Sequence, residues 1–248
     1  MRISKMGNGK KIFILEDEID LNEMIAIELE SRGYDITTFY NPKDFLKAFS
    51  EIKPDLLITD LRLPEVSGEE IIKMVKKIDA YNPPIIAITA YNDVPPQKLF
   101  HIGVESVIYK PFQLLLLSST IERLCTPWEQ RLKLDIEKHE QYAGWIRKLD
   151  ENKMDDILIG RGGFSFSTKE KIENNEIIEF YIRIKNQEGI FLSGKGIVRW
   201  DTVKFIINEQ KIVNKYGVEF VYLDEKSKEY ILSLRYNNII PYIPYEEN

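Results

Sequence analysis

The sequence is poor in cysteine and in long apolar runs, and each shortage excludes a class of protein. Its one cysteine, Cys125, cannot form an internal disulfide, so a disulfide-stapled secreted fold is excluded. No uncharged apolar run approaches the roughly 20 residues of a membrane-spanning helix. The N-terminal stretch also lacks the apolar core of a signal peptide. We therefore expect a cytoplasmic protein that does not enter a membrane.

An excess of positive charge is also missing. The 34 basic and 40 acidic side chains give a net charge of −6, so no basic face for nucleic acid is indicated. A helix-turn-helix pattern is absent as well, and we expect no DNA partner. No internal repeat or low-complexity tract appears. At 248 residues the chain is long enough for two domains, each with its own core.

What the sequence does contain, between residues 11 and about 125, is a regular alternation of strand-like and helix-like runs. Short apolar runs bounded by turn residues are typical of strands buried on both faces of a sheet. The five expected strands are 12–15, 35–40, 55–60, 85–89 and 106–109. Each is followed by a helical stripe of apolar residues. The alternation predicts an α/β domain with a doubly wound, five-stranded parallel sheet.

Polar side chains stand where four of these strands end: Glu16, Asp17, Asp60, Thr89 and Lys110. In a doubly wound sheet the carboxyl ends of the strands lie at one edge, where ligands bind. Three carboxylates at that edge repel one another and need a cation, and oxygen-only ligands favour Mg²⁺ over zinc. A hydroxyl and an ammonium group beside them supply what an incoming phosphoryl group requires.

These residues belong to four segments whose pattern resembles the response regulator receiver domain, the phosphoacceptor module of two-component signalling, which has a flavodoxin-like fold. The segments are Ile14-Leu-Glu-Asp-Glu18, Asp60-Leu-Arg-Leu-Pro-Glu-Val-Ser-Gly68, Thr89-Ala-Tyr91 and Tyr109-Lys-Pro-Phe112. The resemblance implies a receiver domain at residues 1–125 that acts in phosphorelay signal transduction. It implies that a sensor histidine kinase phosphorylates Asp60. The domain would then be a phosphoacceptor, not an enzyme, with self-dephosphorylation as its only reaction.

The resemblance also implies a role for each of the neighbouring residues. Glu16, Asp17, Asp60 and the backbone carbonyl of Arg62 would hold Mg²⁺, Glu16 mainly through water. Lys110 would pair with the phosphoryl group and Thr89 would hydrogen-bond it after a small inward shift. Tyr109 would be the aromatic switch residue, whose ring turns inward once Thr89 has moved. The surface made by the fourth helix, the fifth strand and the fifth helix would then change shape.

After residue 125 the composition changes, and residues 126–150 read as a charged helical connector. Trp128, Leu132 and Ile136 could pack on the receiver domain or pair with a second copy of the chain in a homodimer. From 151 to 248 short strands follow one another closely, which predicts a small antiparallel β-barrel. The expected strands are 156–159, 163–167, 177–184, 189–192, 194–200, 203–207 and 216–222. Asp224 can cap a terminal helix.

This C-terminal part, residues 151–248, resembles the PilZ domain, a β-barrel family that often binds the second messenger cyclic di-GMP. The matching segments are Gly162-Gly-Phe164, Gly196-Ile-Val-Arg-Trp200 and Tyr216-Gly-Val-Glu-Phe220. The ligand motifs of the family are degenerate here. The Arg-x-x-x-Arg pair is absent, and the second motif reads Leu158-Ile-Gly-Arg-Gly-Gly163 without its two polar anchors. Arg161 is the one residue of this motif that could still contact a phosphate.

Two hypotheses for the output domain follow. In the first, the PilZ-like domain is a protein-interaction module for an unknown output protein, gated by phosphorylation of Asp60. In the second, it is an effector that binds cyclic di-GMP and combines nucleotide sensing with the phosphorelay. Loss of charge-assisted contacts, each worth about 1.5 to 3 kcal/mol, favours the first hypothesis.

Overall fold

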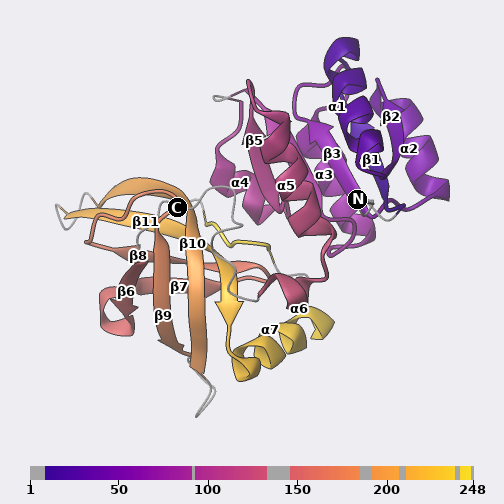
Figure 1. Cartoon of the computed structure of the whole chain (residues 1–248). Coiled ribbons are helices and arrows are strands. Elements are labelled where there is room, and N and C mark those ends of the chain that lie inside the picture. The colour runs from indigo at the N-terminus through magenta and orange to yellow at the C-terminus, as the bar shows by residue number, and fades with distance from the viewer. Residues whose placement is uncertain are drawn as a thin grey trace. The chain divides into compact units, whose positions relative to one another are not determined.

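The structure, a computed structural model, describes residues 9–90, 93–132, 146–184, 191–206, 211–237 and 241–246. The chain divides into two compact units (Figure 1). The first comprises Met1–Pro95 and Ile102–Pro127, and the second comprises Pro96–His101 and Trp128–Asn248. Tyr91 of the third receiver-like segment and residues 133–145 of the expected connector, Ile136 included, lie outside the described residues. None of the helices in the described ranges combines the length and the apolar character that crossing a membrane requires.

The first unit is built on a five-stranded parallel sheet with the order β2-β1-β3-β4-β5. Its strands are β1 (Lys11–Leu15), β2 (Asp35–Phe39), β3 (Leu56–Asp60), β4 (Ile85–Thr89) and β5 (Ser106–Tyr109). The helices that follow these strands are α1 (Ile19–Ser31), α2 (Pro42–Glu51), α3 (Gly68–Ile78), α4 (Pro96–His101) and α5 (Leu114–Cys125). Of these, α4 is the segment grouped with the second unit. The predicted strands and their doubly wound parallel arrangement are confirmed.

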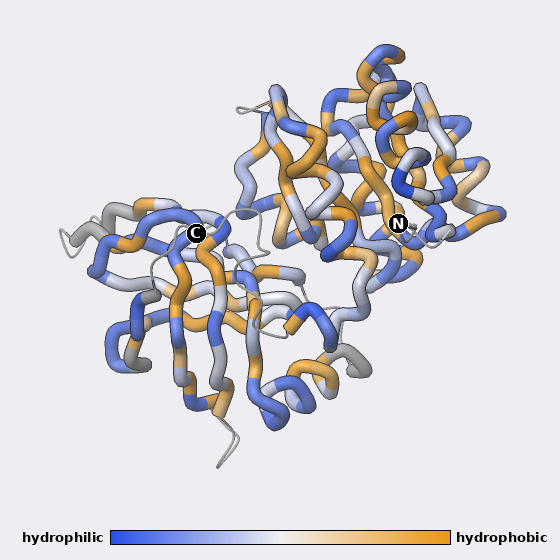
Figure 2. The backbone as a smooth tube through the Cα atoms, viewed as in Figure 1, coloured by the Kyte–Doolittle hydropathy of each residue, from blue (hydrophilic) through white to orange (hydrophobic). Residues whose placement is uncertain are grey.

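Side chains of alternating strand residues bury both faces of this sheet, as a parallel sheet covered by helices requires. On one face Ile14 packs in a cluster with Leu29 of α1 and Ile121 of α5, all fully buried. On the other face Phe13 makes an edge-to-face contact with Phe45 of α2, with ring centroids 6.4 Å apart. The strands are accordingly coloured mainly as hydrophobic in Figure 2.

The start of α3 determines the path of the loop that follows Asp60. Ser67 and Glu70 form a capping box, in which each side chain bonds the backbone N–H of the other residue. Gly68 lies so close to β3 that a Cβ atom there would be 2.0 Å from the carbonyl oxygen of Asp60. The sequence Ser-Gly at this point therefore permits the loop to fold tightly back on the end of β3.

The second unit contains a six-stranded sheet with the order β6-β9-β10-β11-β8-β7. Its strands are β6 (Ile146–Asp150), β7 (Asp155–Ile159), β8 (Gly163–Thr168), β9 (Ile177–Arg183), β10 (Phe191–Ile206) and β11 (Lys211–Leu223). The remaining elements are α6 (Trp128–Arg131), the 3₁₀ turn η2 (Glu151–Lys153) and α7 (Glu225–Asn237). The expected β-rich unit is therefore present.

Two predictions for this region were wrong, and both concern β6. Residues 146–150 form a strand and not the end of a helical connector. This strand pairs in parallel with β9, so the sheet is mixed and not purely antiparallel. No hairpin joins β6 to β9, so nothing in the chain connection requires the antiparallel direction. Leu149 is buried in the core, and Arg147 donates to Glu176 at 2.7 Å, which fixes the strand in place.

A third prediction, of separate strands at 189–192, 194–200 and 203–207, was also wrong. The described part of this stretch is the single strand β10, which pairs with β11 from Gly194 to Ile206. Gly194, which we expected to begin a new strand, lies inside β10. A Cβ atom at this position would be 2.1 Å from the carbonyl oxygen of Tyr222, so glycine allows the two strands to approach closely.

The core of the second unit is aromatic. The ring centroids of Phe164 and Phe180 are 4.7 Å apart, and those of Phe164 and Phe220 are 5.9 Å apart. Leu132 from the expected connector is also buried in this core, and Trp128 packs against it. Trp128 and Leu132 thus pack in the second unit and not on the receiver. Pairing with a second copy of the chain stays a prediction.

The terminal helix α7 is confirmed. Asp224 accepts a hydrogen bond from the backbone N–H of Ser227 at 2.7 Å, as a capping residue does. Ile231 is fully buried, and Tyr230 and Leu234 pack beside it.

Candidate functional site

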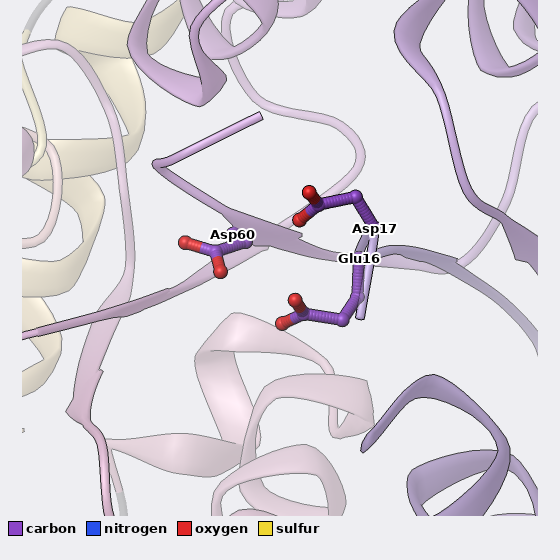
Figure 3. Close-up of side chains that lie close together, drawn as sticks. All are labelled: Glu16, Asp17 and Asp60. Carbon is purple, nitrogen blue, oxygen red and sulfur yellow. The ribbon is translucent and has the colours of Figure 1, made fainter. Parts of the chain in front are cut away.

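Three carboxylates lie together at the carboxyl edge of the parallel sheet (Figure 3). Glu16 and Asp17 follow β1, and Asp60 is the last residue of the neighbouring strand β3. One carboxylate oxygen of each lies within 4.8 Å of the others. Glu16 and Asp60 are buried, whereas Asp17 is exposed to solvent. The parallel topology therefore brings these predicted site residues into one cluster.

Lys110, just after β5, lies against two of these acids. Its Nζ atom is 2.8 Å from Oε2 of Glu16 and 2.5 Å from Oδ2 of Asp60. The other oxygen of Asp60, Oδ1, accepts a hydrogen bond from the backbone N–H of Arg62 at 2.9 Å. Asp60 is thus held by a cation on one side and by a peptide group on the other.

The charges of this cluster shift the proton affinities of its members. Burial raises the pKa of Glu16 from 4.5 to about 7, and the negative charge of Asp60 adds to this, although the hydrogen bond from Lys110 opposes it. Burial alone would lower the pKa of Lys110, but its hydrogen bonds to Asp60 and Glu16 outweigh burial and raise the pKa. Lys110 therefore remains a cation among the carboxylates.

Thr89 ends β4 and is fully buried. Its hydroxyl donates to Oδ2 of Asp93 at 2.7 Å. Asp93 also pairs with the guanidinium group of Arg62. Sequence reasoning missed Asp93 because it lies in a connecting segment, where no strand or helix period indicates which way a side chain points.

Tyr109 is the last residue of β5 and stands opposite Thr89 in the register of the neighbouring strands. It is half-buried. The structure thus brings the two predicted switch residues side by side at the same edge of the sheet. Their roles stay predictions.

The donor set fits a hard divalent cation. All three clustered side chains offer oxygen atoms, which Mg²⁺ prefers, and the exposed position of Asp17 leaves room for the water ligands that Mg²⁺ usually keeps. Among the described residues this is the one group of three or more acidic, histidine or cysteine side chains close enough to share a metal ion.

Arg161, the predicted nucleotide contact, belongs to the second unit and is buried. Its guanidinium carbon lies 4.9 Å from the ring centroid of Tyr242. The backbone N–H groups of Arg161 and Gly162 donate to the carbonyl oxygens of Pro241 and Tyr242, both at 2.9 Å. The segment 241–242 therefore covers this motif, and nucleotide binding by Arg161 stays a prediction.

Comparisons with known proteins agree with the site in the first unit. A family model described as response regulator receiver domain matches residues 12–122. The transcriptional regulatory protein CrdR of Helicobacter pylori is 35% identical over 115 residues, which cover 46% of this chain and 54% of that protein. The phosphate regulon transcriptional regulatory protein PhoB of Pseudomonas aeruginosa is 34% identical over 133 residues, 52% of this chain and 58% of that protein. This chain thus spans about half the length of these relatives.

Solved structures of similar proteins match the same share of the chain. A response regulator receiver domain protein from Clostridium thermocellum is 28% identical with a TM-score of 0.44, and the match covers 47% of this chain and 94% of that one. The response regulator TrrA of Thermotoga maritima, in complex with Mg²⁺ and BeF, is 30% identical with a TM-score of 0.43, and the match covers 46% and 98%.

The PilZ resemblance of the second unit is not confirmed by these comparisons, since the matching family model ends at residue 122. For the first unit, the motifs, the parallel sheet and the family match agree. Residues 12–122 form a response regulator receiver domain.

Proposed function

We propose that this chain is a two-component response regulator in which Asp60 accepts a phosphoryl group from a sensor histidine kinase. The observation that carries the proposal is the position of Lys110, which bridges Asp60 and Glu16 beside a third, exposed carboxylate. An ammonium group at this place can neutralise charge on a transferred phosphoryl group. An ion pair with a purely structural role would not need the third acid or the position at the edge where strands end.

In the proposed transfer, a carboxylate oxygen of Asp60 forms a bond to phosphorus as the bond from phosphorus to the kinase histidine nitrogen breaks. Asp60 becomes an acyl phosphate, with roughly −2 charge and three acceptor oxygens. Lys110 pairs with this charge. Mg²⁺, held by Glu16, Asp17, Asp60 and the carbonyl of Arg62, would supply further neutralisation of the phosphoryl oxygens. We propose no external substrate, and the only hydrolysis expected is that of the chain's own acyl phosphate.

For the second unit we propose a phosphorylation-gated protein-interaction module. Arg161 is covered by Tyr242, and the motif around it lacks polar anchors, so recognition of a nucleotide by these residues has little support. Movement of Thr89 and Tyr109 would transmit the state of Asp60 to the surface that binds the output protein.

One observation favours cyclic di-GMP as a second candidate. A cleft of about 660 Å³ on the second unit is lined by three lysines and two tyrosines, among other residues. These five are Lys148, Lys153, Lys195, Tyr181 and Tyr222. Ammonium groups and aromatic faces suit a ligand with phosphates and purines. Calorimetry with cyclic di-GMP tests this candidate, and micromolar binding that Lys195→Ala weakens would favour it over the interaction module.

The main proposal is tested by labelling with a small phosphodonor such as acetyl phosphate in the presence of Mg²⁺. Mass spectrometry of the intact protein should show addition of one phosphoryl group, and Asp60→Asn should abolish it. Asp35→Asn, an exposed acid at the first residue of β2 and so at the other edge of the sheet, is the matched control and should label normally. Undiminished labelling of Asp60→Asn would remove the assignment. A pull-down with and without beryllofluoride, a phosphoryl mimic, would then identify the output protein.

A further inference from the structure

The hydroxyl group of Thr89 has one proton and can donate it to one acceptor at a time. Its nearest acceptor is Oδ2 of Asp93, at 2.7 Å, and the carbonyl oxygen of Ala90 lies farther away at 3.1 Å. A hydrogen bond to a carboxylate is stronger than one to a neutral carbonyl. In this structure, therefore, the donor that the phosphoryl group on Asp60 would need is already engaged.

Asp93 itself is held firmly in place. Its Oδ2 atom also accepts the backbone N–H of Ala90 at 3.0 Å, and Oδ1 pairs with the guanidinium group of Arg62. The side chain of Asp93 is only 6% exposed, whereas that of Arg62 is 71% exposed. Arg62 is two residues after Asp60, and its N–H bonds the carboxylate of Asp60. Asp93 therefore links the loop that follows the phosphoacceptor to the end of β4.

We propose that Asp93 is a positioning residue that holds the hydroxyl of Thr89 away from the phosphoryl site, with Arg62 fixing the orientation of the Asp93 carboxylate. The proposal rests on the proposed function, because it assumes that Thr89 binds the phosphoryl group. Phosphorylation of Asp60 offers Thr89 a second, doubly charged acceptor. The two acceptors compete for one proton. The phosphoryl group gains the hydrogen bond from Thr89 only when the bond to Asp93 breaks, so a stronger bond to Asp93 lowers the net affinity for the phosphoryl group.

The competition makes a directional prediction. Removing the carboxylate of Asp93 leaves Thr89 with the weaker acceptor, the carbonyl oxygen of Ala90, so a phosphoryl mimic should bind more tightly. A ligand shifts a two-state equilibrium only by its difference in affinity for the two states. If the free hydroxyl is the binding-competent state, raising its fraction lowers the apparent Kd, and we expect a roughly tenfold decrease for Asp93→Ala.

The experiment measures the affinity of beryllofluoride for the full chain in Mg²⁺ by fluorine NMR, where the bound form has its own signal. Asp93→Ala should bind about tenfold more tightly than the wild type. Asp93→Asn keeps an acceptor oxygen but weakens the pair with Arg62, so its affinity for beryllofluoride should lie between those of the wild type and Asp93→Ala. Asp79→Ala is the matched control, because Asp79 also accepts hydrogen bonds from the backbone N–H groups of the segment that follows it, those of Tyr81 and Asn82, but lies after α3. It should bind like the wild type.

A second series in the Thr89→Ala background separates positioning from a merely structural role. There, Asp93→Ala should leave the affinity unchanged, because the residue through which Asp93 acts is absent. The inference would be overturned if Asp93→Ala, in the protein that retains Thr89, bound beryllofluoride no more tightly than the wild type. It would also be overturned if Asp93→Ala increased the affinity for beryllofluoride in the Thr89→Ala background. Should Asp93→Ala fail to fold, the same comparisons are made with Asp93→Asn. If the wild type itself neither binds beryllofluoride nor labels at Asp60, it is the proposed function that fails.

Discussion

At the scale of single residues, the buried carboxylate of Glu16 makes the stability of the metal-free protein depend on pH. Its pKa is raised from 4.5 to about 7, mainly by burial and then by repulsion from Asp60. The folded state therefore binds this proton more tightly than the unfolded state. The contribution of this proton to the stability of the folded state is complete below pH 4.5 and is lost as the pH rises through about 7.

We predict that the free energy of unfolding of the metal-free protein falls across this interval, by on the order of 2 kcal/mol from this group. Chemical denaturation at a series of pH values measures it. Glu16→Gln should flatten the profile, because glutamine does not titrate. Glu18→Gln, a change at a neighbouring exposed acid, should retain the slope. An identical slope in the wild type and in Glu16→Gln would contradict the prediction.

The residues of the cluster could be predicted because each follows directly on a strand. Once the strands are known to be parallel, the ends of β1, β3 and β5 must lie at the same edge of the sheet. The long side chain of Lys110 then reaches Glu16 and Asp60 past the end of β4. Asp93 could not be found in this way. Its contact with Thr89 depends on the fold of the segment after β4. Its ion pair with Arg62 joins two segments that are far apart in the sequence, and no local sequence pattern indicates that they lie close together in space.

At the scale of elements, the contact between Gly68 and the end of β3 determines where α3 can begin. A Cβ atom on residue 68 would be 2.0 Å from the carbonyl oxygen of Asp60, and a backbone atom cannot rotate away as a side chain can. We predict that Gly68→Ala lowers the free energy of unfolding by about 1–3 kcal/mol and slows labelling of Asp60, because the loop must shift.

Gly9→Ala is the control for this change. Residue 9 has a φ of +69° but no atom within 4 Å of an added Cβ. Gly9→Ala should therefore lower the free energy of unfolding only by the cost of an alanine in the left-handed backbone region, about 1–2 kcal/mol. Labelling should proceed at the wild-type rate in Gly9→Ala. A normal labelling rate in Gly68→Ala would show that the close approach does not position the phosphoacceptor.

The elements of the first unit were predicted well because the apolar runs are short and separated by helical stripes. The second unit was harder. The pair Arg147-Lys148 looks like part of a charged helix, yet β6 is at the edge of the sheet, where charged side chains are common. We expected Gly194 to begin a new strand, but it lies inside β10, where the missing side chain allows a close approach to β11. Local sequence does not distinguish these cases.

At the scale of the whole molecule, the two units have hydrophobic clusters with no members in common. Phe180 is buried among aromatic rings of the second unit, and its loss leaves a large cavity. We predict that Phe180→Ala destabilises the second unit by about 3–5 kcal/mol, while the strands of the parallel sheet keep their protection in hydrogen exchange. Phe49→Ala, in the first unit, should reduce hydrogen-exchange protection in the parallel sheet and leave the protection of the second unit unchanged. Equal loss of protection in both units would contradict the prediction.

The separation of the two clusters along the chain has a consequence for biosynthesis. The apolar residues that surround Ile14 come from positions 12 to 124, and all of them precede β6. A ribosome adds roughly 5–20 residues per second and releases the earlier part of a chain first. We therefore expect the interior around Ile14 to close while the aromatic segments are still being translated. The nascent chain would then present the unpaired strands of only one unit at a time, first those of the parallel sheet and later those of the second unit, and fewer strand edges would be available for aggregation at any moment.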